Sequence, residues 1–393
     1  MTAVAVMLWA TAAWLLLPTL ADVVNLARCL TRRGQCARDP AAHLPRLLFV
    51  VPAHNEEKTL GACLASLQQM DYPPAELAVV VVADNCDDAT ASIASSAGVQ
   101  CLVRADPERR GKPHALAWAL ARLPVADFDA VTIVDADTEV APDFARMLAQ
   151  SGAARNVALQ PYNAVLNRTA NALTRMAAVL SSANHQYAFR LKSCAGCNVP
   201  LSAGMCLGTD ILRSHGWAAY SIGEDWEWYA HLTAEGIPVR SAWRGRISAQ
   251  EAVSLRQSGP QRRRWMLGKA YVLLTVGPRI VMSRRASTAQ QLDAIAELTQ
   301  LGPVLQLTLV GFGVAAATLA GVPNGAPLTI ALMTSLVRPV VYSSLAMIAD
   351  PQPGRALLAF GYLPVYAAWR LANALWGLIT LRDRRWVRTG RTA

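Results

Sequence analysis

The sequence predicts an α/β domain flanked by membrane helices. From Arg46 onward, short β-branched runs alternate with amphipathic stretches, and long apolar segments stand before and after this region. The chain has 393 residues, of which 53% are hydrophobic, 7% aromatic and 16% charged, and its mean hydropathy is +0.25. This composition disfavours a disordered or fibrous protein. The length leaves room for a folded domain of about 200 residues beside several membrane helices.

The first element is an almost unbroken apolar run from Ala3 to Ala21, which is long enough to cross a bilayer. No Lys or Arg precedes the run and no small-residue cleavage site follows it, so a membrane anchor over residues 1–25 is favoured over a signal peptide. The arginines that follow predict that the next domain faces the cytoplasm.

The middle of the chain predicts an open sheet covered on both faces. Continuous apolar runs typical of buried strands cover Leu47–Val51, Leu77–Ala83 and Ala130–Val134. Amphipathic helices are predicted between them, over Glu56–Met70, Asp87–Ala97 and Pro113–Leu123. Asn55 is expected to cap the first helix, and Pro113 suits a first helical turn. In such a sheet, ligands bind at the carboxyl ends of the strands.

Three apolar segments follow Gln300 and predict membrane helices over residues 301–381, namely Leu301–Ala320, Pro327–Ala349 and Ala356–Leu381. Arg338 lies within the second, and Arg370 and Asn373 within the third, so these two are expected to be kinked, packed or partly interfacial. Four spans would leave the basic tail, 382–393, outside, against the positive-inside rule, so one segment is expected not to cross. Residues 271–300 are predicted to be an interfacial amphipathic region.

The net charge of +10 comes from 37 Lys and Arg against 27 Asp and Glu. The basic excess sits largely in short clusters beside apolar segments, which favours anionic membrane lipids rather than nucleic acid as a partner. The clusters are Arg28/Arg32/Arg33/Arg38, Arg262/Arg263/Arg264, Arg284/Arg285 and Arg382/Arg384/Arg385/Arg388. The eight cysteines show no disulfide-scaffold spacing and are expected to be reduced thiols in the cytosol. Cys194 and Cys197 form a lone C-x-x-C, interpreted as a buried or neutral pair in preference to a metal site.

Carboxylates follow each of the three predicted strands. Asp84 follows the second strand, and Asp135 and Asp137 follow the third. Residues two apart in extended chain point to the same side, so this pair can face one cavity. Paired oxygen ligands suit Mg²⁺ or Mn²⁺, which completes its shell with water and substrate phosphates. A surface turn is the alternative interpretation of the D-x-D motif alone.

Six ordered motifs resemble the GT-A nucleotide-sugar domain of family 2 glycosyltransferases, over roughly Arg46 to Gly268. They are Pro52–Glu56, Asp84, Gly111-Lys112 with Ala115-Leu116, Asp135/Asp137, Glu224-Asp225 and Gln261-Arg262-Arg263-Arg264-Trp265, which matches Q-x-x-R-W. The order of anchor, catalytic domain (46–270) and C-terminal helices is similar to cellulose, hyaluronan and chitooligosaccharide synthases and to bacterial exopolysaccharide and lipid glycosyltransferases.

The resemblance implies a donor site for a UDP-sugar. Asp84 and the first loop, consisting of Pro52, Ala53, His54, Asn55 and Glu56, would bind the nucleoside. Lys112 would contact the phosphates, although a solvated surface lysine is its alternative interpretation. Asp135 would contact the nucleotide sugar or the metal-bound phosphate, and Asp137 would bind the metal directly.

The resemblance also implies the chemistry. Asp225, paired with Glu224, would be the general base that takes the proton of the acceptor hydroxyl in a single, inverting displacement. Both acids also suit a helix N-terminus, over the predicted helix Asp225–Glu235, which is the structural alternative. Gln261, Arg264 and Trp265 would contact diphosphate and acceptor, although a basic-aromatic membrane anchor fits Arg262 and Arg263. Leu201–Cys206 resembles the acceptor-side segment of the family but lacks its G-N-G.

The sequence therefore predicts a metal-dependent glycosyltransferase of the inner membrane, active at its cytoplasmic face. We expect transfer of one sugar to a lipid-linked or saccharide acceptor in polysaccharide or glycolipid biosynthesis, with a polysaccharide-export protein as a candidate partner. Processive β-glycan synthesis is the close alternative. Transfer of one sugar is favoured over it because only three apolar segments follow Gln300 and no gating-loop sequence is recognisable after Trp265. A catalytically silent membrane scaffold and a nucleotidyltransferase-like enzyme are the alternatives from other classes.

Overall fold

The structure, a computed structural model, describes residues 3–31, 44–322 and 325–379. The chain divides into two compact units, each assembled from separate stretches. The sheet unit comprises Gly34–Asn167 and Asn198–Glu251, and the helical unit comprises Met1–Arg33, Arg168–Cys197 and Ala252–Thr389. Two sets of predicted basic residues lie outside the described residues: the tail 382–393, which includes Gly390–Ala393, and the arginines Arg32, Arg33 and Arg38.

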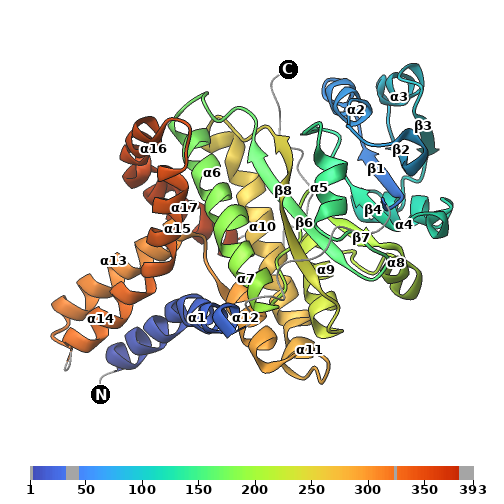
Figure 1. Cartoon of the computed structure of the whole chain (residues 1–393). Helices are drawn as coiled ribbons and strands as arrows, with labels where there is room; N and C mark the ends of the chain where they lie inside the picture. The colour runs from blue at the N-terminus through green and yellow to red at the C-terminus, as the bar shows by residue number, and fades with distance from the viewer. Residues whose placement is uncertain (1–2, 32–43, 323–324, 380–393) are drawn as a thin grey trace. The chain divides into compact units, whose positions relative to one another are not determined.

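The sheet unit is built on eight strands in the order β3-β2-β1-β4-β7-β6-β8-β5 (Figure 1). Their bounds are β1 Leu47–Ala53, β2 Leu77–Asp84, β3 Gln100–Arg104, β4 Ala130–Ile133, β5 Thr138–Val140, β6 Ala158–Val165, β7 Cys206–Gly208 and β8 Val239–Ala249. The α/β class predicted from the sequence is confirmed.

One half of the sheet is parallel, and it contains all three strands that the sequence predicted. β1 pairs with β2 on one side and with β4 on the other, and β2 pairs with β3. Val50 of β1 lies between Val80 and Ile133 of its two neighbours, and all three are buried. Burial on both faces of the sheet explains why these strands are continuous apolar runs.

The other half is mixed, and its strands were not predicted. β7 is antiparallel to β4 and β6, β8 is parallel to β6, and β5 is antiparallel to β8. β5 and β7 have three residues each, too few for a hydrophobic period to show. The direction of the sheet therefore changes at β4, the strand that leads into the D-x-D motif.

The helices of the sheet unit are α2 Leu60–Gln68, α3 Thr90–Ser96, α4 Lys112–Leu120, α5 Phe144–Gln150, α8 Thr209–His215 and α9 Glu224–Ala234, with the short 3-10 turns Pro74–Glu76 and Val125–Asp127. α3 packs beside β2 and β3 (Figure 1). The core under the sheet joins Phe49 of β1 to Leu64 of α2 and Phe144 of α5, all with 0–1% of their surface exposed.

The first predicted helix starts later than expected, and the expected cap is wrong. α2 begins at Leu60 rather than Glu56, and its N-cap residue is Thr59. Asn55 has a φ of 57°, in the left-handed region that Asn tolerates better than most residues. Asn55 therefore shapes the loop after β1. The predicted helices at Pro113 and Asp225 are present as α4, with Pro113 in its first turn, and α9.

The helical unit contains α1 Ala3–Thr31, α6 Ala172–Ser182, the π-helical turn η3 Ala183–Ala188, α7 Phe189–Ala195, α10 Leu255–Thr275, α11 Gly277–Val281, α12 Thr288–Thr299, α13 Pro303–Leu319, α14 Gly325–Ser335, α15 Val337–Ile348, α16 Pro353–Ala359, the turn η4 Phe360–Tyr362 and α17 Leu363–Ile379. One cluster of buried apolar side chains joins α1 to α13 and α14, and it includes Leu15, Val310 and Leu332. The three helices are labelled in Figure 1.

Among the described residues, two helical stretches are long and apolar enough to cross a membrane, Ala3–Thr31 and Gly325–Ile348. A third crossing would require α12 and α13 to act together across a bend of 80°. Arg338, within the second stretch, is buried, and its Nε donates to Asp22 Oδ2 of α1 at 2.8 Å. The charge is therefore packed against a partner, as expected for a charged residue in an apolar segment. The last predicted segment, 356–381, is divided between α16, η4 and α17 within the described residues.

Two cysteines of the helical unit form a disulfide, so the expectation of reduced thiols is wrong for this pair. Cys29 of α1 is bonded to Cys194 of α7, across 165 residues of sequence. Cys194 therefore does not pair with Cys197, which is a buried thiol that donates to Asn25 Oδ1 at 3.2 Å. In the described parts of the chain, no group of three or more His, Cys, Asp or Glu side chains could hold a metal.

Candidate active site

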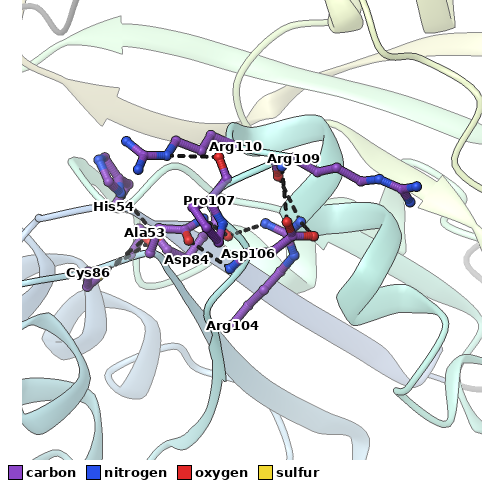
Figure 2. Close-up of polar contacts among 10 residues, drawn as sticks. Ala53, His54, Asp84, Cys86, Arg104, Asp106, Pro107, Arg109 and Arg110 are labelled. Carbon is purple, nitrogen blue, oxygen red and sulfur yellow. Dashed lines mark hydrogen bonds and ion pairs between the residues drawn. The ribbon is translucent and has the colours of Figure 1, made fainter.

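The loop after β1 is held by the loop after β2. Asn55 and Asp87 form two hydrogen bonds, because Asn55 Nδ2 donates to Asp87 Oδ1 and Asp87 N donates to Asn55 Oδ1. His54 Nδ1 lies 2.7 Å from Asp84 O, the contact drawn in Figure 2. Glu56 N donates to Thr90 Oγ1 at 2.8 Å. The left-handed turn at Asn55 therefore fixes the first predicted donor loop beside Asp84.

Asp84 forms a buried ion pair that the sequence did not reveal. It stands opposite Arg104 in the register of β2 and β3, and Arg104 Nη1 donates to Asp84 Oδ1 (Figure 2). The two side chains are only 6% and 4% exposed. Arg104 Nη2 also donates to Asp106 Oδ2 at 2.8 Å and to Arg109 O at 2.7 Å. Arg104 thus connects Asp84 to the loop that precedes Lys112.

The D-x-D aspartates follow β4, at the carboxyl ends of the parallel strands. Lys112 Nζ, from the first turn of α4, donates to Asp135 Oδ1 at 2.6 Å and lies 3.5 Å from Glu224 Oε1. Thr138 Oγ1 donates to Asp137 Oδ1 at 3.3 Å. Lys112 is 28% exposed and Asp135 34%, so both side chains are partly open to solvent. Three motifs that are far apart in sequence therefore meet around one ammonium group.

The ammonium of Lys112 is held in its charged form. Burial lowers the pKa of Lys112, but the carboxylates of Asp135 and Glu224 raise it by more, and the net pKa lies above the ordinary value. Lysine is a compact point charge suited to phosphate oxygens. A surface lysine without partners, the alternative interpretation, does not describe this residue.

Asp225 stands beside Glu224 at the start of α9. Its Oδ1 accepts a hydrogen bond from Trp226 N at 2.8 Å. Burial, and secondly the charge of Glu224, raise the pKa of Asp225 to about 7, although Trp226 N and Lys112 act in the opposite direction. A carboxyl that titrates near neutral pH is suited to accept a proton from a hydroxyl. Asp225 therefore combines two features: it lies in the first turn of α9, as the structural alternative expects, and its pKa is raised, as suits a general base.

The segment Leu201–Cys206 lies directly beside the D-x-D strand. Gly204 N donates to Ile133 O at 3.0 Å, and Ile133 N donates to Met205 O at 2.9 Å. Gly204 has a φ of +77°, and a Cβ there would lie 2.6 Å from Ile247 Cδ1. A glycine at this position therefore allows the segment to run close against β8 and the end of β4.

The Q-x-x-R-W residues belong to α10 of the helical unit. Gln261 and Arg264 are partly buried, and Trp265 is 41% exposed. The guanidinium of Arg262 lies 5.1 Å from the centre of the Trp265 ring, and Arg263 Nη1 donates to Asn373 Oδ1 at 2.9 Å. Arg262 and Arg263 therefore have partners within the helical unit. The roles predicted for Gln261, Arg264 and Trp265 stay predictions.

The mixed α/β sheet, with acidic loops at the carboxyl ends of its parallel strands, has the GT-A fold. The chain belongs to the family described as "Glycosyltransferase like family 2", whose model matches residues 45–268, more than half of its length.

Among curated proteins, the chain is similar to the "Probable glycosyltransferase YdaM" of Bacillus subtilis (strain 168). The two are 23% identical over 60% of this chain and 58% of that protein, so the chain spans under two thirds of this relative. It is 28% identical to the "Uncharacterized glycosyltransferase YaiP" of Escherichia coli (strain K12), over 74% of this chain and 70% of that protein.

Among solved structures, the mannosyltransferase PcManGT from Pyrobaculum calidifontis, in complex with GDP-Man and Mn²⁺, has a TM-score of 0.61 and 22% identity. The match covers 96% of this chain and 98% of that one. At this identity the likeness establishes the shared fold.

Proposed function

We propose that this glycosyltransferase transfers a sugar, with inversion, from a UDP-sugar to a lipid-linked or saccharide acceptor at the cytoplasmic face of the inner membrane. The observation that carries the proposal is Lys112, which joins Asp135 of the D-x-D motif to Glu224 beside Asp225. The proposal is supported because an ammonium group suited to bind phosphate lies beside the acidic pair that would remove the proton. The whole activity, including substrate and partners, is part of the proposal.

The donor would bind along the carboxyl ends of β1, β2 and β4. The Asp84 carboxylate, oriented by Arg104, can accept hydrogen bonds from a base N–H or a ribose hydroxyl. Pro52, Ala53, His54, Asn55 and Glu56 form the rest of the nucleoside loop. Lys112 would leave Asp135 for the diphosphate, since a phosphate group offers the same charge-assisted contact.

Asp137 and Asp135 would hold Mg²⁺ or Mn²⁺. Their oxygens are the hard ligands that these ions prefer, and two protein carboxylates suffice because substrate phosphates complete the shell. The D-x-D pair is partly exposed rather than closed, which fits an ion that arrives with its nucleotide. When bound, the ion would offset negative charge on the departing diphosphate.

Asp225 would act on the acceptor. Its carboxylate takes the proton of the acceptor hydroxyl while the hydroxyl oxygen forms a bond to the anomeric carbon, and the bond from that carbon to the diphosphate oxygen breaks. One displacement of this kind inverts the anomeric centre. Glu224 would keep Lys112 beside the reacting groups.

The helical unit supports the proposed membrane placement. Ala3–Thr31 and Gly325–Ile348 are candidate spans, and basic residues next to apolar segments favour the cytoplasmic side. Lipid-linked acceptors and a polysaccharide-export partner would meet the enzyme there, in exopolysaccharide or glycolipid synthesis.

The test is nucleoside diphosphate release by the full chain in nanodiscs, with a panel of UDP-sugars and GDP-mannose, candidate saccharide and lipid-linked acceptors, and Mg²⁺ or Mn²⁺. We expect turnover with one UDP-sugar, its loss with EDTA and its loss in Asp225→Asn. Asp210→Asn is the matched control, because Asp210 is likewise the second residue of its helix, α8, but is exposed.

The size of the product separates transfer of one sugar from processive synthesis. Turnover with GDP-mannose alone would overturn the UDP-sugar assignment. The absence of both turnover and metal-dependent nucleotide binding would contradict the enzyme and favour the scaffold.

A further inference from the structure

Three cysteines of the helical unit lie at the junction of α1 and α7. Cys29 and Cys194 form the disulfide, with their Cα atoms 5.2 Å apart. Cys197 donates its thiol hydrogen to Asn25 Oδ1, and Asn25 stands one helical turn before Cys29 on α1. Cys194 and Cys197 therefore both contact the same side of α1. Cys197 is also only three residues from Cys194 in sequence.

The turn after α7 brings this second sulfur back toward the helix. Gly196 adopts a left-handed conformation, with φ 73°, and Cys197 N donates to Lys192 O at 2.9 Å. The chain thus reverses between the two cysteines instead of extending away. Arg28 Nε of α1 donates to Ala195 O at 3.0 Å, so α1 also contacts the backbone of this turn. The nucleophile in disulfide exchange is the thiolate.

We propose that Cys29, Cys194 and Cys197 form a thiol–disulfide exchange site that attaches α1 to α7 reversibly. The Cys197 thiolate attacks Cys194 Sγ, a bond forms between these two sulfurs, and the bond from Cys194 to Cys29 breaks. Cys29 leaves as a thiolate and takes up the proton that Cys197 lost. The exchange needs no oxidant or reductant, because the number of disulfides is unchanged.

The consequence is a change in how α1 is held. Before exchange, α1 is covalently joined to α7, and afterwards non-covalent contacts alone remain. These include Asn25 Nδ2 to Asp293 Oδ1 at 2.7 Å, where Lys192 Nζ also donates at 2.7 Å. A dithiol reductant would open the Cys194–Cys197 bond in turn, so that Cys197 serves as the resolving thiol.

The site is also one peptide bond from the sheet unit. Asn198, the next residue, is buried there and donates to Thr233 Oγ1 of α9 at 3.0 Å and to Ile237 O at 2.9 Å. The exchange site therefore adjoins, along the chain, the segment that supports the helix of Glu224 and Asp225.

The experiment maps disulfides in the full chain, purified in detergent without reductant. The protein is treated with limiting dithiothreitol, free thiols are alkylated at successive times, and non-reduced peptides are quantified by mass spectrometry. For the wild type we expect a Cys29–Cys194 link at the start and a transient Cys194–Cys197 link as it declines. In Cys197→Ser the Cys29–Cys194 link should disappear several-fold more slowly.

Cys197→Ala repeats the measurement with an apolar replacement, in case the buried hydroxyl disturbs folding, and the thermal transition of each variant verifies its fold. Cys101→Ser, in β3 of the sheet unit, is the control that should match the wild type. The absence of the Cys29–Cys194 link, the absence of the Cys194–Cys197 link, or equal rates in wild type and both Cys197 variants would each overturn the proposal. No outcome depends on the sugar donor or on activity.

Discussion

Asp225→Asn is expected to remove activity while it increases the stability of the protein. The carboxyl has a pKa of about 7 in the folded chain against an ordinary 3.8, so the folded state holds its proton more tightly than the unfolded state. Wild-type stability therefore declines as the pH rises from about 4 to about 7 and is level above that. Asn resembles the protonated carboxyl and keeps the oxygen that accepts from Trp226 N.

The size of the effect follows from the difference between the two pKa values. About three units at about 1.4 kcal/mol each set an upper limit of about 4 kcal/mol. Asp225 keeps some solvent contact, so we expect a gain of ~1–2 kcal/mol at pH 8 and none at pH 4. Ionisation also sets the activity, because about a tenth of the carboxyl is ionised at pH 6 and about nine tenths at pH 8. Wild-type kcat should fall about tenfold between pH 8 and pH 6.

Thermal unfolding in detergent at pH 4 and pH 8, together with donor turnover at pH 8, checks both expectations. The variant should melt a few degrees higher than wild type at pH 8 and at the same temperature at pH 4, with turnover lowered ~10²- to 10⁴-fold. Equal melting temperatures at pH 8 would show that the carboxylate is not destabilised there. Unchanged turnover would refute its role as the base.

Three further predictions concern the sheet unit. Lys112→Met should raise the KM for the donor about 10- to 100-fold through loss of a charge-assisted phosphate contact, and a donor titration that gives the wild-type KM would contradict this. Arg104→Met should lower the free energy of unfolding by ~3–5 kcal/mol because it leaves the Asp84 carboxylate buried and unpaired. Adding Asp84→Asn should recover part of that loss in a thermal melt, whereas additive losses would argue against the ion pair. Gly208→Ala should destabilise the fold strongly, because its Cβ would lie 2.3 Å from Arg155 O, whereas Gly61→Ala, in open space on α2, should raise stability by ~0.5–1 kcal/mol. Thermal melts that rank these two variants in the opposite order would refute the packing argument.

The sequence predicted the parts of the site that strand ends bring together. Apolar runs locate β1, β2 and β4, and parallel pairing puts the ends of these strands at one edge of the sheet, so Asp84 and Asp135 lie at the same edge, as expected. Arg104 could not be found this way. Its strand is exposed or half-buried except at Arg104 itself, so it lacks the pattern of a buried strand, and its pairing with Asp84 depends on a register that no local pattern encodes.

Two errors have physical causes, one local and one tertiary. Asn is a favoured helix N-cap residue, and it also tolerates positive φ. In the structure Asn55 has positive φ, and its side chain is hydrogen-bonded to Asp87 instead of capping α2. The Cys29–Cys194 bond joins helices that are distant in sequence, so neither spacing nor composition points to it. Tertiary proximity of this kind is information that a single sequence does not contain.

The interleaving of the two units affects how the protein can be dissected and made. The helices α6 and α7 interrupt the sheet unit between β6 and β7, and the helical unit begins before the first strand and ends after the last. No single cut in the chain releases either unit intact. A truncation that removes α1 and everything after Glu251 would still carry α6 and α7, with Val179 and Ala183 stripped of their partners Ala346 and Ala356. During synthesis, the strands β1 to β6 are made before β7 and β8, so the sheet cannot be completed until the 84 residues from 166 to 249 have also been made.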